Sequence, residues 1–217
     1  MTTIHVITKK CYVCGKSSEH SEIGSTNAFG SPDLDTRPPE MQRSTIALWI
    51  QICPSCGYSY PDISEGTNKK VEFINTDSYK KQSKNSEFPK LANAFLCYSL
   101  IQENNCEYSR ACWSSIHAAW VCDDAKKETG SQKCRMRAVS LFGKAKENNQ
   151  QFIEQGEEAL MVDLLRRAKQ FEMAQSMCDD GITKKPDKII LDILHFQHKL
   201  IRNKDVACYQ IKDALKE

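Results

Sequence analysis

The sequence lacks any long apolar segment. No run in its 217 residues approaches the length of about 20 residues that a membrane-spanning helix needs. The first residues, Met1 to Thr8, are too short and too polar for a secretory signal. We therefore expect a cytoplasmic protein that makes no membrane contact.

An excess of charge of one sign is also missing, because the formal net charge is only +2. Residues 1–62 carry five Lys and Arg against six Asp and Glu, which gives −1, and residues 63–217 carry 25 against 22, which gives +3. Neither part is the strongly basic surface typical of nucleic-acid binding. The ordinary apolar content and the low charge exclude collagen-like and highly charged disordered chains.

Motifs of common enzymes are absent as well. The sequence has no glycine-rich phosphate loop, no nucleophile elbow and no metalloprotease helix. His195 and His198 lie three residues apart, beside Asp192, but without the metalloprotease spacing, so a metal role for them is disfavoured. These absences favour a protein that is not an enzyme.

Cysteine is abundant, with 11 residues. In a reducing compartment such cysteines act as metal ligands or as small buried side chains more often than as disulfides. Four of them form two pairs of the same type, Cys11-Tyr-Val-Cys14-Gly and Cys53-Pro-Ser-Cys56-Gly. Two thiolates separated by two residues can bind one ion from a tight turn, and the glycine lets the backbone turn toward the sulfurs.

A strand-like alternation precedes each pair, over Ile4–Ile7 and over Ile46–Ile52. Strand, cysteine pair and strand, repeated twice, is the arrangement of a zinc ribbon. We predict that the cofactor is one structural Zn²⁺, since four thiolates leave no open position for water. The predicted ligands are Cys11, Cys14, Cys53 and Cys56. A redox dithiol, iron or an iron–sulfur cluster are the alternatives.

A long loop separates the two cysteine pairs. Its prolines stiffen residues 29–41, where Asp33, Asp35 and Arg37 could present a fixed polar surface. This surface contacts a protein partner or the helical half in one interpretation, and only braces a loop that covers the ribbon in the other. A carboxylate metal site at Asp33 and Asp35 is a weaker alternative.

Composition changes near residue 63, because five of the seven prolines precede it and helical periodicity begins at Leu91. We therefore expect an α+β protein with a zinc ribbon over residues 1–63, a polar connector over 64–90 and helical hairpins over 91–217. One short strand is expected near Val71–Ile74. The pattern Ala-x3-apolar-x2-small starts at Ala138, Ala174 and Ala207, with spacings of 36 and 33 residues, which indicates stacked helix–turn–helix units. A generic helical bundle is the alternative.

Several other side chains have competing interpretations. The seven remaining cysteines are expected to be small buried residues, with a second metal site involving Cys106 and Cys112 as the alternative. An aromatic stripe on one helix indicates packing more than base stacking; it consists of Trp113, His117 and Trp120. A lysine-rich stretch indicates a solvated linker more than a nucleic-acid contact; it consists of Lys69, Lys70, Lys80, Lys81 and Lys84.

Several segments resemble an uncharacterised prokaryotic family that joins a four-cysteine zinc ribbon to tetratricopeptide-like helices. The similar segments are Cys11–Gly15, Asp33–Asp35, Cys53–Tyr58, Ala111–Asp123 and Leu164–Ala174. The resemblance implies zinc binding, tetratricopeptide-like helical hairpins and a role as an interaction scaffold, with no known reaction.

We thus predict a zinc-binding adaptor that docks a protein partner through its helical array. A zinc-ribbon factor associated with nucleic acid is the second hypothesis, and a thiol redox sensor is the third. Salt-sensitive binding that depends on the lysines would favour the second, and a reactive thiol in the metal-loaded protein would favour the third.

Overall fold

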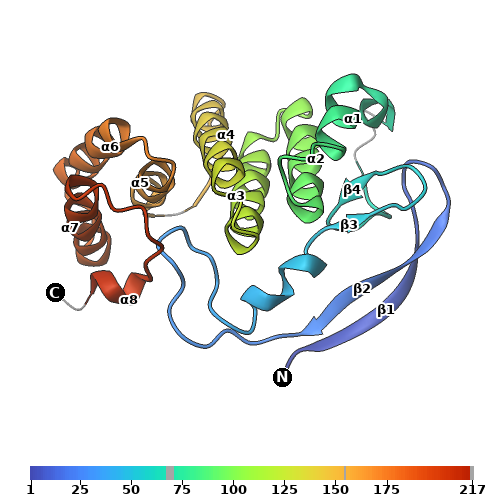
Figure 1. The fold of residues 1–217 in the computed structure, drawn as a ribbon, viewed down its shortest axis with the longest axis horizontal. Coiled ribbons are helices and arrows are strands. Elements are labelled where there is room, and N and C mark those ends of the chain that lie inside the picture. The colour runs from blue at the N-terminus through green and yellow to red at the C-terminus, as the bar shows by residue number, and fades with distance from the viewer. Residues whose placement is uncertain (67–70, 154, 216–217) are drawn as a thin grey trace.

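A computed structural model describes residues 1–66, 71–153 and 155–215, with β hairpins at the N-terminal end and helices after them (Figure 1). The strands are β1 (Thr3–Lys10), β2 (Ser17–Ser25), β3 (Gln51–Ile52) and β4 (Ser59–Tyr60). Two 3-10 helices are η1 (Arg43–Leu48) and η2 (Val71–Asn75). The α-helices are α1 (Asp77–Ser83), α2 (Lys90–Asn104), α3 (Tyr108–Asp124), α4 (Glu128–Glu147), α5 (Glu157–Arg167), α6 (Phe171–Thr183), α7 (Lys188–Arg202) and α8 (Ile211–Ala214).

The N-terminal part contains two separate antiparallel hairpins. Strand β1 pairs with β2 along its whole length, from Thr3 opposite Ser25 to Lys10 opposite Ser17. Strand β3 pairs with β4, with Gln51 opposite Tyr60. A cysteine pair lies in the turn of each hairpin, so the predicted order of strand, cysteine pair and strand is found twice.

The strand predicted over Ile46–Ile52 is mostly wrong. Residues up to Leu48 form the 3-10 helix η1, and only Gln51 and Ile52 are extended. The reason is that Ile46 and Ile50 are four residues apart and both enter the core that contains α2 and α3. The indole N–H of Trp49 also donates to the hydroxyl of Thr45 at 2.8 Å, which closes a turn.

The connector predicted over residues 64–90 is more ordered than its composition indicates. The strand expected near Val71–Ile74 is wrong, because this segment has no partner strand and forms the 3-10 helix η2. Helix α1 follows, with the hydroxyl of Thr76 as its N-cap acceptor and Tyr79 buried on its inner side. Lys69 and Lys70 lie outside the described residues.

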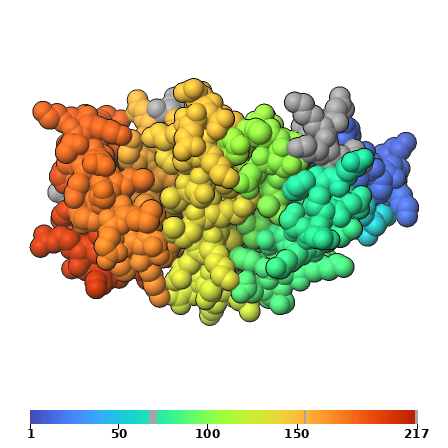
Figure 2. All heavy atoms as spheres, turned by 90° about the horizontal axis from the view of Figure 1, so that it is seen from above, coloured from blue at the N-terminus to red at the C-terminus, as the bar shows by residue number. Residues whose placement is uncertain are grey.

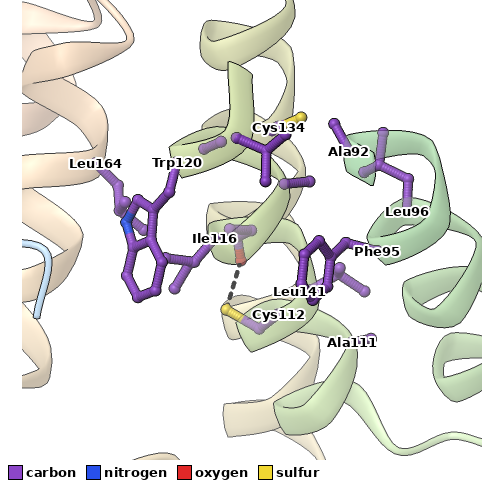
Figure 3. Close-up of a cluster of buried hydrophobic side chains, with 14 of the residues drawn as sticks. Ala92, Phe95, Leu96, Ala111, Cys112, Ile116, Trp120, Cys134, Leu141 and Leu164 are labelled. Atoms are coloured by element: carbon purple, nitrogen blue, oxygen red, sulfur yellow. Dashed lines mark hydrogen bonds between the residues drawn. The ribbon is translucent and has the colours of Figure 1, made fainter. Parts of the chain in front are cut away.

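From α1 to α7 the helices follow one another in an arc, each packed mainly on its neighbours in the sequence (Figure 1). Seen from above, the helices follow in chain order along the long axis (Figure 2). The central core joins α2, α3, α4 and α5. Phe95, Ile116, Leu141 and Leu164 meet there, and Trp120 lies on the side of α3 that faces α5 (Figure 3). The prediction of a mostly helical C-terminal region is confirmed, and α2 begins at Lys90, while α1 lies within the predicted connector.

The same turn ends most of these helices. After α2, α3, α4, α5 and α7, the second residue beyond the helix has a positive φ, and the next N–H donates to a carbonyl five residues back. In Schellman turns of this type glycine is the usual residue. Here the residues are Cys106, Lys126, Asn149, Lys169 and Lys204. The lysines place positive charge near the carbonyl ends of the helices, where it is favourable.

The third copy of the expected repeat is wrong. Ala207 lies in an irregular segment, and α8 is only four residues long. The guanidinium group of Arg166 donates to the backbone carbonyls of Asp205 and Ala207 at 2.6 and 3.0 Å, so these groups are engaged outside any helix. The neighbouring backbone pairs with the N-terminal loop instead, from Leu34 N–H to Tyr209 O at 2.9 Å.

In the part of the chain that the structure describes, no helix combines the length and the apolar character needed to cross a bilayer.

Candidate metal centre and aromatic groove

The two hairpin turns bring four cysteine sulfurs together. The Sγ atoms of Cys11 and Cys56 are 3.7 Å apart, and those of Cys14 and Cys53 are 3.6 Å apart. All four sulfurs lie within 4.8 Å of one another. Each short distance joins one hairpin to the other, so the cluster holds the two turns together and could hold one metal ion.

Matching backbone turns aim the four thiols at one point. The N–H of Cys11 donates to Lys16 O at 2.9 Å, and the N–H of Cys53 donates to Tyr58 O at 2.8 Å. Gly15 and Gly57 follow the second cysteine of each pair with φ values of +70° and +76°. A glycine is favoured at this conformation because it has no Cβ.

Backbone donors also favour the thiolate form at Cys53. Burial raises the pKa of Cys53. The N–H groups of Cys56 and Ser55 and the neighbouring thiols lower it by a larger amount, so the pKa is about 7. Burial raises the pKa of Cys11 above its usual value. Because one thiol ionises near neutral pH, the cluster is suited to bind a metal cation. Binding of the cation would favour deprotonation of the other three thiols.

Residues outside the two cysteine motifs support this cluster. The hydroxyl of Tyr79 in α1 donates to Gly57 O at 2.9 Å and accepts the N–H of Ser59 at 3.0 Å. Cys11 and Cys53 share a buried cluster with Tyr79, Tyr58 and residues of α2. Sequence reasoning missed Tyr79, because it stands in a lysine- and serine-rich stretch that indicates a linker.

The loop between the cysteine pairs lies against the helical half. The carboxylate of Asp35 is fully buried. Its Oδ2 accepts the indole N–H of Trp120 at 2.9 Å and a guanidinium N–H of Arg167 at 2.7 Å, and Arg135 lies 3.7 Å away. Arg135 and Arg167 both also pair with Asp123, at 2.5 and 2.7 Å. A carboxylate in the loop thus completes an ion network built on α3, α4 and α5.

The other two predicted loop residues are similarly engaged. Both guanidinium N–H₂ groups of Arg37 donate to the carboxylate of Asp124, at 2.9 and 2.6 Å. The carboxylate of Asp33 lies 2.6 Å from a guanidinium nitrogen of Arg43 and accepts the thiol of Cys208 at 3.3 Å. Asp33 is 2% exposed and Arg37 is 7% exposed. The loop therefore contacts the helical half, which is one of the contacts that we expected.

These contacts disfavour two other interpretations of the loop, which were a contact with a protein partner and a carboxylate metal site. A buried side chain that already pairs within the chain cannot also contact an outside protein unless the loop moves. Asp33 and Asp35 each face an arginine, so the weaker alternative of a carboxylate metal site gains no support. Within the described residues, the four cysteines are the metal-ligand group that the structure forms.

A groove lies between the N-terminal part and α3. One cavity of about 240 Å³ is lined by Trp49, Trp113, His117, Phe95, Tyr98, Ser114, Arg110, Ile50 and Pro61. An adjoining cavity of about 450 Å³ shares Trp49, Trp113 and His117 and adds Trp120, Pro32, Pro38, Pro39, Thr36 and Gln42. All three tryptophans of the chain thus line one groove. Packing accounts for Trp120, which is buried, whereas Trp113 and His117 remain partly exposed.

His117 stands among aromatic rings. Its centroid lies 5.2 Å from that of Trp49, 4.9 Å from that of Trp120 and 5.4 Å from that of Phe95. Burial lowers the pKa of His117 to about 4. The imidazole is therefore neutral at physiological pH, with one N–H and one free nitrogen.

The remaining expected residues form no second site. Cys97, Cys112, Cys122, Cys134 and Cys178 are buried as expected, whereas Cys106 and Cys208 are exposed. Cys112 donates to Ala138 O at 3.2 Å (Figure 3), and no metal-ligand group of described residues includes it or Cys106. His198 lies 3.6 Å from Asp179, and no such group includes His195.

Comparison of the chain with protein-family models, with curated proteins and with solved structures gives no match. The resemblance to a zinc-ribbon family is therefore supported only in its coarse features, the four-cysteine cluster and the helical C-terminal region.

Replacing Cys11 with Ser should abolish stoichiometric metal binding, because it removes one of four thiolates from the cluster. Elemental analysis of the purified chain is expected to find one metal ion per wild-type molecule and much less in the variant. Cys106→Ser is the matched control, since Cys106 is exposed and lies outside the cluster. Equal metal content in wild type and Cys11→Ser would contradict the assigned ligands.

Replacing Arg167 with Met should destabilise the protein by about 3–5 kcal/mol, because it leaves the carboxylates of Asp35 and Asp123 short of a partner in a buried site. Urea denaturation of the metal-loaded chain measures this loss. Lys133→Met is the control; it breaks an exposed ion pair with Glu87, and the expected cost is below about 1 kcal/mol. A loss for Arg167→Met no larger than this control would show that the network contributes little.

Acidification should destabilise the fold through His117. Its pKa is about 4 in the folded chain against the ordinary 6.5, so the unfolded chain binds more protons between these pH values. The free energy of unfolding should fall by about 1.4 kcal/mol for each pH unit from 6.5 down to 4. The variant His117→Gln should lack this component. Metal loss at low pH affects both proteins, so the difference between their pH profiles measures His117, and identical profiles would refute the assignment.

Proposed function

We propose that the four-cysteine cluster binds one structural Zn²⁺. Sulfurs at about 2.3 Å from a tetrahedral zinc ion are about 3.8 Å apart, close to the two distances between the hairpins. Four thiolates fill the coordination shell, so the ion would hold the two turns together and leave no position for a reacting water. On this basis we also propose that the protein is not an enzyme.

We propose further that the protein is an adaptor, in which tetratricopeptide-like helical hairpins dock a protein partner. The observation that carries this proposal is the groove along α3, because Trp49, Trp113 and His117 in its lining are partly exposed and lie beside the contact between loop and helices. Stacked helical pairs commonly bind partners along such extended surfaces. All 11 cysteines are unpaired, which fits our proposal that the protein acts in the reducing cytoplasm.

Association with nucleic acid is the second candidate. The observation that favours it is the exposed basic pair Lys80 and Lys81 on α1. Phosphate contacts by these lysines would make binding strongly dependent on salt.

Affinity capture from the native host tests the adaptor function. The tagged, metal-loaded full chain is compared with Trp113→Ala and with Phe29→Ala, a control whose aromatic ring is exposed and lies outside the groove. We expect a stoichiometric protein that survives nuclease treatment and is lost only with Trp113→Ala. Proteins that disappear after nuclease, with RNA or DNA in the untreated sample, would favour the second candidate. An empty eluate would contradict the adaptor function.

A further inference from the structure

The groove along α3 has walls of fixed aromatic rings. The ring of Trp113 stacks on that of Phe152 behind it, with centroids 4.8 Å apart and an interplanar angle of 16°. Trp49 is held by its hydrogen bond to Thr45 and by an edge-to-face contact with Trp120 at 6.4 Å. Rings held in this way lose little conformational entropy when a ligand packs on them.

The indole N–H of Trp113 differs from those of the other two tryptophans in its hydrogen bonding. The N–H of Trp49 is donated to Thr45, and the N–H of Trp120 is donated to Asp35. Within the described residues, the N–H of Trp113 has no acceptor and the ring of His117 has no hydrogen-bond partner. Both residues line the groove on the same side of α3, four residues apart. The groove thus offers donors for the carbonyl groups of a ligand.

The residues that line the groove carry positive charge and no negative charge. Arg110 is one turn of α3 before Trp113, and it forms no ion pair with a described residue. The residues that line the two cavities include no Asp or Glu. The charge of Arg110 repels a cationic ligand at this end of the groove and favours a carboxylate beside the apolar part of the ligand.

Three of the chain's own prolines line the larger cavity together with these rings. Pro38 and Pro39 belong to the wall of the larger cavity that the loop supplies, together with Pro32, while Trp113, His117 and Trp120 supply the wall on α3. The smaller cavity continues along α3 toward Arg110, beyond these prolines. The two cavities together form an elongated space with prolines in its wall at one end and Arg110 at the other.

A polyproline segment matches all of these features. Its prolyl rings are apolar and lack an N–H, and its carbonyls have no internal hydrogen bonds, so it accepts bonds from donors such as Trp113 and His117. Grooves lined by aromatic side chains are the usual sites for such segments. A single strand of nucleic acid would also stack on the tryptophans, but it needs a series of cations along its phosphates, and one arginine lines this groove.

We propose that the groove between the N-terminal loop and α3 binds a proline-rich segment of a partner protein, in an extended polyproline conformation, with an acidic residue next to the prolines at Arg110. This inference rests on the adaptor function, because it names the chemistry of the partner that the adaptor docks. The prolines pack on Trp49 and Trp113, and their carbonyls accept hydrogen bonds from Trp113 and His117.

A peptide array tests the inference on the metal-loaded full chain. The probes are ten-residue peptides with a fixed central Pro-Pro and randomised flanking residues, and the same peptides with Ala-Ala at the centre. We expect retention of the proline set alone, with Asp and Glu enriched on one side. Equal retention of the two sets, or retention of neither, would overturn the inference.

The strongest retained peptide is then titrated in solution, with intrinsic tryptophan fluorescence as the readout, since all three tryptophans line the groove. Trp113→Ala should weaken binding at least about tenfold. Arg110→Glu should shift the preference from acidic to basic flanks, a change that partial unfolding would not produce. Arg202→Glu, an exposed charge reversal outside the groove, is the control. An unchanged flank preference in Arg110→Glu would overturn the assigned orientation.

Failure of this inference is distinguishable from failure of the adaptor function. A partner that is captured through Trp113 but bound by a segment without proline would leave the adaptor function standing and overturn the inference. A single-stranded oligothymidylate that displaces the peptide and binds more tightly would also overturn it. Selective binding of proline peptides would support the inference even if affinity capture failed.

Discussion

The burial of one carboxylate governs how the two parts of this chain fit together. Asp35 is fully buried, and a carboxylate in such a place is tolerated only when donors and cations surround it. Trp120, Arg135 and Arg167 meet this demand, and they come from three different helices. If the loop left its place, the two arginines would lose a counter-ion and the indole its acceptor. The charges of the loop and of the helices are therefore balanced only when the two are in contact.

The four-cysteine cluster and the groove both involve the N-terminal part that this contact joins to the helices. The segments before and after the second cysteine pair supply Trp49 and Pro61 to the groove, the loop supplies Pro38 and Pro39, and α3 supplies Trp113. Elsewhere in the N-terminal part, the hydroxyl of Tyr79 holds the second cysteine turn against α1. The N-terminal part is thus fixed at two places, by Tyr79 near the cysteines and by Asp35 near α3. The groove lies between these two contacts, so its shape depends on both.

The sequence was sufficient to predict the features that rest on local pattern. The spacing of Cys11, Cys14, Cys53 and Cys56 predicted their convergence, and the helical period predicted the array. Features that depend on distant partners were not predictable in this way. The alternation through Ile46 and Ile50 indicated a strand, yet the core against α3 selected a helical turn. Tyr79 was hidden in a polar stretch, and the two acidic loop residues gave no sign of which arginines would face them.

The pairing of the loop with residues 209–211 has a consequence for synthesis. Leu34 donates its N–H to the carbonyl of Tyr209, and Ile211 donates to that of Pro32, so a segment made early rests on a segment made much later. Contacts between residues so far apart in the sequence form slowly, because the intervening chain must first be ordered. The loop must therefore wait, with Asp35 in water, until α5 and the residues after α7 have left the ribosome. During that interval the partly made chain exposes apolar surface that a chaperone could bind.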